Sequence, residues 1–191
     1  MDDAEFLNAV AFIKTDVERE LQIARLNGRG ELGTVLHSGG GNLLAALGLL
    51  CYTEFGGKIL FGHKKKNGDD HSKKNFDDFF RMLGPKYAAL LGVCNVYNVF
   101  RCGLAHEYAV KEPCSIAMFS DQPDGIGVGP TGIHFIVVQS YFRALLAALQ
   151  SVPRLRRIRY RAYFLWENRT GRCWWDAESN WLEAESAEPA G

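Results

Sequence analysis

The stretch from Pro85 to Tyr108 constrains the fold of this 191-residue chain more than any other part of the sequence. Residues 87–100 are apolar at most positions, so a helix formed by them has little room for a solvated face. The polar exceptions recur at intervals of three, at Asn95, Asn98 and Arg101. We therefore expect a long helix over residues 85–105 that is buried in a core or a subunit interface, with a polar stripe that a partner helix would satisfy.

Arg101 and His106 carry most of the chemical interest of this stretch. Five residues apart on an unbroken α-helix, they would lie about 140° round from each other and would not share a site. A looser backbone at Gly103 would turn His106 back toward Arg101, because glycine adopts conformations that other residues avoid. A symmetric dimer would bring two copies together with the same result. The structural alternative is that Arg101 caps carbonyl groups at the helix end and that His106 is an ordinary residue of the next turn.

With Tyr108, these two residues form an Arg-x4-His-x-Tyr pattern at the end of a buried helix. The pattern resembles the signature of the HEPN superfamily (higher eukaryotes and prokaryotes nucleotide-binding), and the resemblance covers mainly residues 42–110. It implies a compact helical domain that forms a homodimer and that is, in many members, a metal-independent endoribonuclease. It also implies that Arg101 holds a phosphate and that His106 is general acid or base in a cleft shared by two protomers, where the 2′-hydroxyl of RNA attacks the adjacent phosphate.

The resemblance also suggests partners. In one toxin–antitoxin branch of the family, a nucleotidyltransferase adenylylates the tyrosine that corresponds to Tyr108, so RNA and a nucleotidyltransferase or another antitoxin are the expected partners. We expect Asn95 and Asn98 to support the site. Cys102 departs from the family pattern, since catalytic members often carry a polar residue directly after the arginine. The alternative function is therefore a catalytically inactive HEPN-like module for interaction and dimerisation.

Charge and cysteine content restrict the remaining classes of function. Lys plus Arg and Asp plus Glu each number 22, so any attraction of nucleic acid must come from local patches. The five cysteines are never spaced as C-x-x-C, which indicates reduced thiols and argues against a zinc site. The chain shows no basic leader with an apolar core and no apolar run of 18 residues, so we expect a cytoplasmic protein that uses no membrane, metal or cofactor.

Two helices are predicted in the first third of the chain. Apolar residues at steps of three and four predict an amphipathic helix over about residues 3–27, with Gly28 as its stop. Residues 42–55 are apolar nearly all round and predict a central helix that ends at Gly56-Gly57. This central helix is the expected partner of the helix over residues 85–105.

A polar loop over residues 61–71 follows. Its three lysines are candidates for contact with an RNA backbone: Lys64, Lys65 and Lys66. The same loop holds residues of metal-binding type, but no regular element fixes their spacing, and a solvated loop is favoured: His63, Asp69, Asp70 and His71. Ser72 or Asn75 is the expected N-cap of a short helix that Gly84-Pro85 closes, with these residues inward: Phe76, Phe79, Phe80 and Leu83.

The periodicity changes after Pro113. Residues 115–119 and 133–138 are predicted strands, and the turn-rich segment 121–132 joins them into a hairpin. A helix over residues 141–150, with Ser140 as its cap, comes next.

The strongest local positive charge lies at residues 154–161. Apolar residues alternate with arginines there, which predicts a half-buried strand with three side chains on its exposed face: Arg157, Arg159 and Arg161. A second strand over residues 172–175 would follow. The alternative is a helix with one apolar face: Leu155, Ile158, Ala162 and Leu165. The arginines suit RNA contacts and equally suit a solvated face paired with the acidic tail.

These patterns together predict an α+β fold. A predominantly helical, HEPN-like bundle over residues 1–152 would include a β-hairpin at 115–138, and C-terminal strands within 153–176 would pack on the same domain. An acidic tail, residues 177–191, would be partly disordered. The expected function is a dimeric RNA-binding protein of toxin or defence type, in which Arg101 and His106 are candidate residues for endoribonuclease activity.

Overall fold

The computed structural model shows a mostly helical chain with one small, three-stranded sheet, which confirms an α+β class dominated by helices. It divides the chain into two units, each described by itself: residues 1–153 and residues 154–191. The residues that the structure describes are 1–28, 42–111, 113–118 and 125–169.

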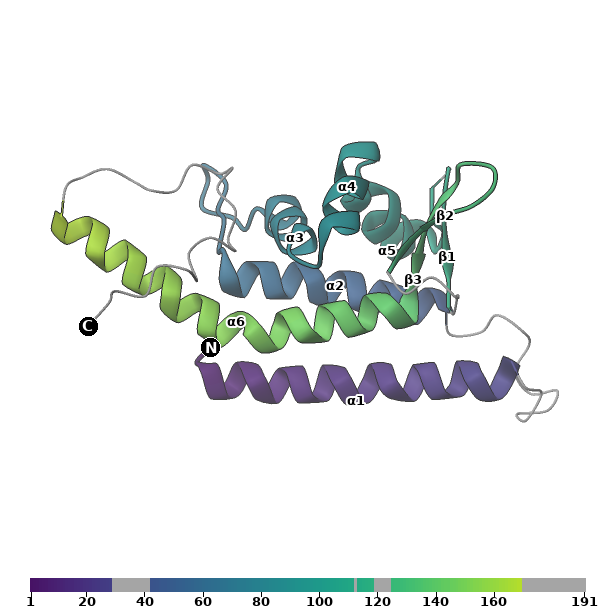
Figure 1. Ribbon diagram of the computed structural model, residues 1–191, viewed down its shortest axis with the longest axis horizontal. Helices are drawn as coiled ribbons and strands as arrows, with labels where there is room; N and C mark the ends of the chain where they lie inside the picture. The colour runs from purple at the N-terminus through teal and green to yellow at the C-terminus, as the bar shows by residue number, and fades with distance from the viewer. Residues whose placement is uncertain (29–41, 112, 119–124, 170–191) are drawn as a thin grey trace. The chain divides into compact units, whose positions relative to one another are not determined.

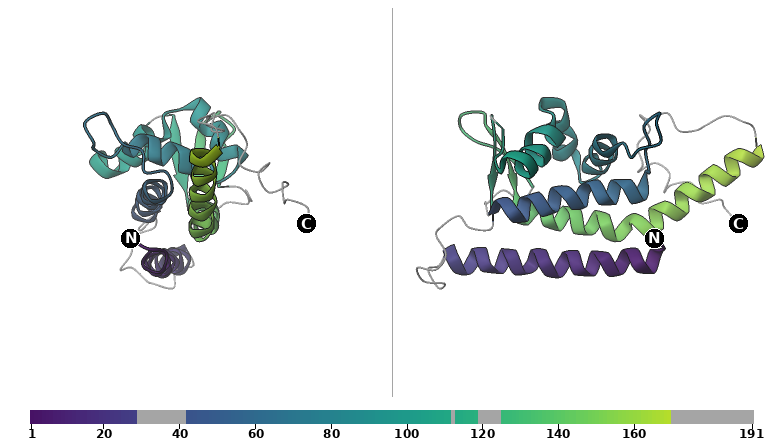
Figure 2. Two further views of the ribbon diagram at one scale, coloured as in Figure 1. Left: turned by 90° about the vertical axis from the view of Figure 1, so that its left-hand side faces the viewer. Right: turned by 180° about the vertical axis from the view of Figure 1, so that it is seen from behind.

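Three helices lie side by side in the first unit (Figures 1 and 2): α1 (Asp3–Gly28), α2 (Asn42–Leu60) and the part of α6 (Val138–Arg169) that precedes Pro153. The rings of Phe6 on α1 and Phe55 on α2 stack with centroids 5.7 Å apart. The hydroxyl groups of Thr53 on α2 and Tyr141 on α6 form a buried hydrogen bond of 2.5 Å. The predicted helix over residues 3–27 is confirmed. Its regularly spaced apolar residues, from Phe6 to Leu21, are all buried.

Helix α2 continues through both glycines that were expected to end it, so that prediction is wrong. The glycines instead allow neighbouring elements to come close. A Cβ atom on Gly57 would lie 1.9 Å from the carbonyl oxygen of Asn75, and one on Gly56 would lie 2.7 Å from the Phe79 ring and 2.8 Å from Leu149. Both positions therefore need hydrogen as a side chain because the backbone or side chains of other helices occupy the space.

By length and composition, residues 43–60 of α2 are also apolar enough to cross a lipid bilayer. The core helix of a globular domain meets the same requirement, and here α2 packs against α1, α3 and α6. The stretch includes two charged residues, Glu54 and Lys58, so no uninterrupted apolar run is present.

Helix α3 (Ser72–Arg81) crosses α2 and is anchored by aromatic residues. Phe76, Phe79 and Phe80 are completely buried, as predicted, whereas Leu83 lies beyond the helix and is half-buried. The N-cap is His71 rather than Ser72 or Asn75, since the His71 ring accepts a hydrogen bond of 3.4 Å from the Lys74 amide.

The single helix predicted over residues 85–105 is broken. Helix α4 (Pro85–Val93) ends at Cys94, whose backbone is extended, and a π-helix η2 (Tyr97–Cys102) then leads into α5 (Gly103–Glu107). The two parts are bent by 80° relative to each other. An apolar composition on both sides of the bend hides it from the sequence pattern, because each part buries its own residues, among them Leu90, Val96 and Phe100.

The sheet differs from the predicted hairpin in its strand pairing. Strand β1 (Cys114–Ala117) pairs in parallel with β3 (His134–Val137), and the supposed turn segment contains a further strand, β2 (Ile126–Val128), which pairs antiparallel with β3. The strand order is β1-β3-β2. The hairpin thus joins β2 to β3, and β3 runs directly into α6.

The predicted strand at the arginine-rich segment is wrong, and the alternative, a helix, is correct. Helix α6 starts at Val138, earlier than predicted, and continues to Arg169 with Pro153 inside it. The arginines therefore belong to a helix, in which alternate residues lie on different faces instead of on one face as in a strand. The predicted strand over residues 172–175 and the acidic tail lie outside the described residues.

Candidate functional site

Arg101 lies on η2, where its guanidinium meets groups from α2. Its Nε atom is 3.0 Å from Oε2 of Glu54, and the two side chains are 23% and 20% exposed. The guanidinium carbon also lies 5.8 Å from the centre of the Tyr97 ring, one helical turn earlier. Arg101 is therefore held between a carboxylate and an aromatic face, in a setting that is half-buried and still open to solvent.

The pair of Arg101 and Glu54 is joined by charge rather than by an aligned hydrogen bond. The two facing atoms, Nε and Oε2, are both buried and neither has a hydrogen-bond partner, although they are 3.0 Å apart. Burial works to lower the pKa of Arg101, but the neighbouring Glu54 carboxylate, with smaller effects of Cys51 and Tyr97, raises it overall. Arg101 stays charged, and the carboxylate already neutralises much of its charge.

The wide turn of η2 sets the position of Arg101. The amide of Gly103 donates hydrogen bonds to the carbonyls of Asn98 and Phe100, five and three residues before it. Gly103 itself has helical angles, φ −55° and ψ −51°, so the predicted loosening is not at this glycine but in the turn before it. The role of Gly103 is close packing, since a Cβ atom there would lie 2.5 Å from the carbonyl oxygen of Ala109. Short π-helical turns of this kind often occur at functional sites.

His106 occupies the last turn of α5 and is exposed. Within the described part of the chain its side chain forms no hydrogen bond or ion pair, including with Arg101. Its imidazole is accessible to solvent. Arg101 and His106 are therefore not in contact within one chain, and their convergence in a symmetric dimer stays a prediction.

The asparagines and Tyr108 flank the site. Oδ1 of Asn95 accepts a 3.2 Å hydrogen bond from the Asn98 amide, so Asn95 caps the start of the second helical part instead of belonging to a continuous stripe. Both asparagines are exposed. Tyr108 ends α5 in the left-handed conformation, with φ 52°, and its side chain is 60% exposed. Tyr108 is therefore largely open to solvent.

The lysine-rich loop is more ordered than expected. Lys64 and Asp70 form an isolated β-bridge, and the Lys65 amide donates a 2.8 Å hydrogen bond to the Asp69 carbonyl. Asp70 pairs with both Lys64 and Lys58, and these contacts lower its pKa. Lys65 and Lys66 are exposed and form no ion pair with any residue that the structure describes.

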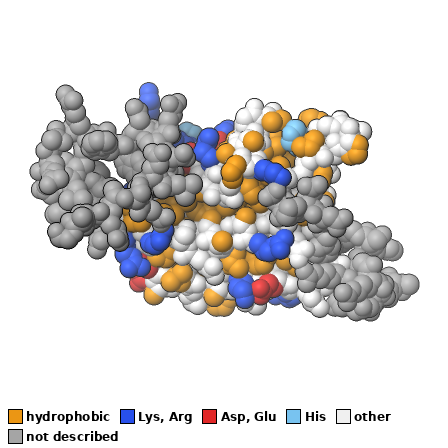
Figure 3. All heavy atoms as spheres, viewed as in Figure 1, with side chains coloured by type: hydrophobic (Ala, Val, Ile, Leu, Met, Phe, Trp, Pro, Cys, Tyr) orange, Lys and Arg blue, Asp and Glu red, His pale blue; other side chains and the backbone are white. Residues whose placement is uncertain are grey.

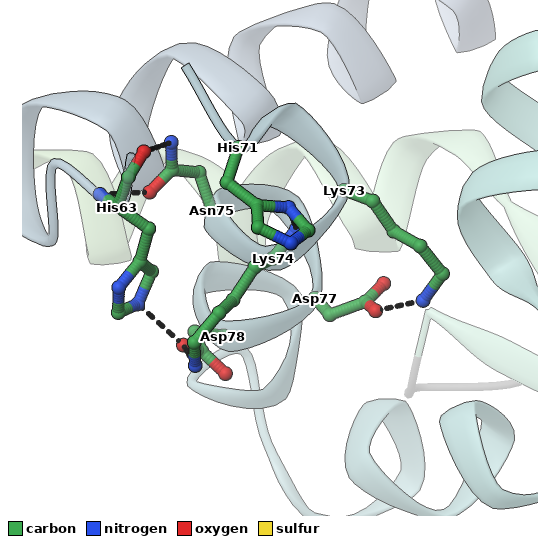
Figure 4. A network of polar contacts seen from close by, with 7 residues as sticks. All are labelled: His63, His71, Lys73, Lys74, Asn75, Asp77 and Asp78. Carbon is green, nitrogen blue, oxygen red and sulfur yellow. Dashed lines mark hydrogen bonds and ion pairs between the residues drawn. The ribbon is translucent and has the colours of Figure 1, made fainter. Parts of the chain in front are cut away.

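The other side of this loop is tied to α3 (Figure 4). The side chain of the buried Asn75 forms two hydrogen bonds with the backbone of His63: Oδ1 accepts from the His63 amide at 2.8 Å, and Nδ2 donates to the His63 carbonyl at 3.3 Å. Nε2 of His63 lies 2.8 Å from Asp78, which also pairs with Lys74 at 3.0 Å. The candidate ligands of this loop do not converge, and within the described ranges no group of three or more His, Cys, Asp or Glu side chains is placed to hold a metal ion.

The arginines predicted to contact RNA belong to the second unit. On α6, Arg157 and Arg161 are four residues apart and share a face, whereas Arg159 lies on another. The three arginines therefore do not form the single exposed row that a strand would give them. The side chain of Arg161 is outside the described residues.

Glu54 is the site residue that the sequence interpretation missed. It is the only acidic residue between Asn42 and Leu60, and a lone carboxylate in an apolar helix signals a buried partner. Cys51 lies one turn before it, and burial raises the pKa of this thiol, whereas Arg101 works to lower it.

No protein-family model matches the chain, and no curated protein or solved structure is significantly similar to it. The HEPN hypothesis therefore rests on the Arg-x4-His-x-Tyr pattern of the sequence alone.

Proposed function

We propose that this protein is a dimeric, HEPN-like RNA-binding protein that cleaves RNA without a metal ion, as toxins or defence proteins of that type do. Arg101 would bind the phosphate and His106 would transfer the proton. The observation that carries the proposal is the contrast between these two residues on one short helical segment. Arg101 is fixed by Glu54 and Tyr97, whereas the His106 imidazole is exposed and uncommitted.

The proposed chemistry needs only these side chains and the RNA. The 2′-hydroxyl attacks the adjacent phosphorus, a P–O bond forms, and the bond to the 5′-oxygen of the next nucleotide breaks. A histidine removes the proton from the 2′-oxygen or supplies one to the leaving oxygen, since an imidazole titrates near neutral pH. Arg101 stabilises the negative charge on the phosphate oxygens through its planar, permanently charged fork. The products carry a 2′,3′-cyclic phosphate and a 5′-hydroxyl.

Cleavage of mixed single-stranded RNAs in the presence of EDTA tests this proposal. We expect cleavage to persist in EDTA and the new 3′ ends to resist phosphatase until acid opens the cyclic phosphate. Cleavage that requires a divalent ion, or products with a free 3′-hydroxyl, would contradict the mechanism.

A catalytically inactive interaction module is the second candidate, and the Glu54 contact favours it. The carboxylate occupies a position where it neutralises Arg101, and a phosphate would have to compete with it. In this case the pair of Arg101 and Glu54 only ties η2 to α2. Intact RNA after incubation with folded, dimeric protein would support this second function.

Replacement of Glu54 by glutamine separates the two candidates. If Arg101 binds phosphate, the substitution removes the competing charge and should tighten binding of a single-stranded RNA by about threefold to tenfold. Fluorescence anisotropy with a labelled RNA measures this change. Glu18→Gln is the matched control, because it also removes a carboxylate paired with a basic residue, Lys14, but lies on α1. Equal, weak binding by both variants and the wild type would argue for the interaction module.

We also expect the protein to form a dimer that involves α4 and the start of α2. On the face seen in Figure 3, hydrophobic side chains lie at the surface in the region of α4. Val93 on α4 is 60% exposed and Leu44 on α2 is 55% exposed, and only Tyr87 and Leu90 of α4 are buried in the monomer. Sedimentation velocity at micromolar concentration should give twice the mass of one chain. A Val93→Asp variant should shift the protein toward monomer, whereas a single-chain mass for the wild type would contradict the dimer.

Tyr108 provides the proposed contact for a nucleotidyltransferase partner. Its exposed hydroxyl lies two residues after His106, so a nucleotide attached there would place negative charge beside the proposed catalytic residue.

A further inference from the structure

Two cysteines meet where the helical bend touches the sheet. Cys94 ends α4 at the bend and Cys114 begins β1, and their sulfur atoms are 4.0 Å apart although the residues are 20 positions apart in the sequence. Both are free thiols and both are half-buried. A disulfide needs a sulfur separation of about 2 Å, so a modest side-chain movement would close the gap.

The segment between these cysteines contains the whole Arg-x4-His-x-Tyr pattern. It leaves Cys94, runs through η2 and α5, turns at Tyr108 and returns to Cys114. Backbone hydrogen bonds already hold the returning chain against the outgoing helix, from the Ala109 amide to the Gly103 carbonyl at 3.4 Å and from the Lys111 amide to the Val99 carbonyl at 3.2 Å. A bond between the sulfur atoms would close the open end of this loop.

We propose that Cys94 and Cys114 form a reversible disulfide bond that closes a covalent loop around residues 101–108. A small-molecule disulfide such as oxidised glutathione is the oxidant. One protein thiolate attacks it and releases one thiol, and the second protein thiol loses its proton to solvent and displaces the other. The two cysteines thus lose two hydrogen atoms, and the oxidant is reduced to two thiols. The inference is independent of the proposed RNA cleavage.

Cys114 is the nucleophile in the first step of this reaction. Burial, together with the neighbouring Cys114 thiol, raises the pKa of Cys94 to about 12. Burial also raises the pKa of Cys114, but its contact with Cys94 works in the opposite direction. Thiolates are therefore scarce at neutral pH, so bridge formation should become faster as the pH rises from 7 to 9.

Peptide mapping of the full-length wild-type protein tests the bridge directly. Trypsin separates the relevant cysteines into different peptides, since cleavage after Lys86, Arg101, Lys111 and Arg143 places Cys94, Cys102 and Cys114 apart. After oxidation with glutathione disulfide, the non-reducing digest should contain peptide 87–101 linked to peptide 112–143. A different linked pair, or a glutathione adduct on Cys114 that persists without a bridge, would overturn the proposal.

Thermal unfolding supplies a second, independent readout. A bridge that closes a loop of this length should raise the Tm of the oxidised protein by about 5–10 °C over the reduced protein. Cys94→Ser and Cys114→Ser should each remove this difference, whereas Cys102→Ser, a half-buried cysteine within the loop, should retain it. Equal Tm values for the oxidised and reduced wild type would overturn the proposed covalent closure, and this comparison requires no variant to fold.

Discussion

Replacement of His106 by alanine is expected to lower the rate of RNA cleavage by at least 100-fold, because general acid or base catalysis typically contributes a factor of about 10² to 10⁴. Replacement of Arg101 by alanine should have an effect of similar size, since it removes the group that we propose stabilises charge on the phosphate. Single-turnover cleavage of a labelled RNA measures both changes. His106 is exposed, so its substitution should leave the circular dichroism spectrum and the Tm unchanged.

Matched variants separate chemistry from structure in this experiment. Arg101→Lys keeps the positive charge beside Glu54 but removes the planar fork, so it should preserve the fold while losing much of the activity. His134→Ala removes a histidine on β3 and should retain cleavage. Full activity in a double Arg101→Ala, His106→Ala variant would place the active site elsewhere.

Replacement of Gly57 by alanine should lower the free energy of unfolding by about 3 kcal/mol or more. The added methyl group would lie 1.9 Å from the carbonyl oxygen of Asn75, a backbone atom that cannot rotate away. Asn75 also holds the loop at His63, so the displacement should extend to that network. Urea denaturation followed by circular dichroism measures the change.

Gly48 offers a control within the same helix. A Cβ atom there would lie 3.6 Å from the Tyr52 ring, an ordinary contact. Gly48→Ala should therefore stabilise the protein by up to about 1 kcal/mol, because alanine favours the helix. Equal stability losses for the two variants would mean that Gly57 does not mark a close approach of α2 and α3.

The helices with a clear polar face were predictable from the sequence. The period of apolar residues located α1, and the buried phenylalanines located α3, because one face of each helix packs and the other is solvated. Helix α2 was recognised but ended too early. Local patterns cannot distinguish a glycine that ends a helix from one that lets another backbone come close, as at Gly57.

Elements that depend on distant contacts were less predictable. The bend after α4 lies within a stretch that is apolar on both sides, so its hydrophobic period does not reveal it. The parallel pairing of β1 with β3 joins strands whose local patterns are compatible with a simple hairpin. The arginine-rich segment fits both a period of two and a helical face, and the structure shows the helix.

The sequence also identified only part of the candidate site. Arg101, His106 and Tyr108 were named from their spacing, but the carboxylate that holds Arg101 comes from α2, some fifty residues earlier in the chain. The available signal for this partner was Glu54, the lone acidic residue in the apolar helix α2. The wide turn of η2 had no comparable signal, since π-helical hydrogen bonding depends on how the segment packs.

The most direct test of the central claim compares two RNAs of the same sequence in EDTA. One is entirely ribose, and in the other the nucleotide on the 5′ side of the mapped cleavage site lacks its 2′-hydroxyl. If the RNA supplies its own nucleophile to a site made of Arg101 and His106, the wild-type protein should cleave the first RNA at that site and leave the second intact there. Equal cleavage of both would contradict 2′-hydroxyl attack, and cleavage of neither by folded, dimeric protein would contradict the proposed ribonuclease activity.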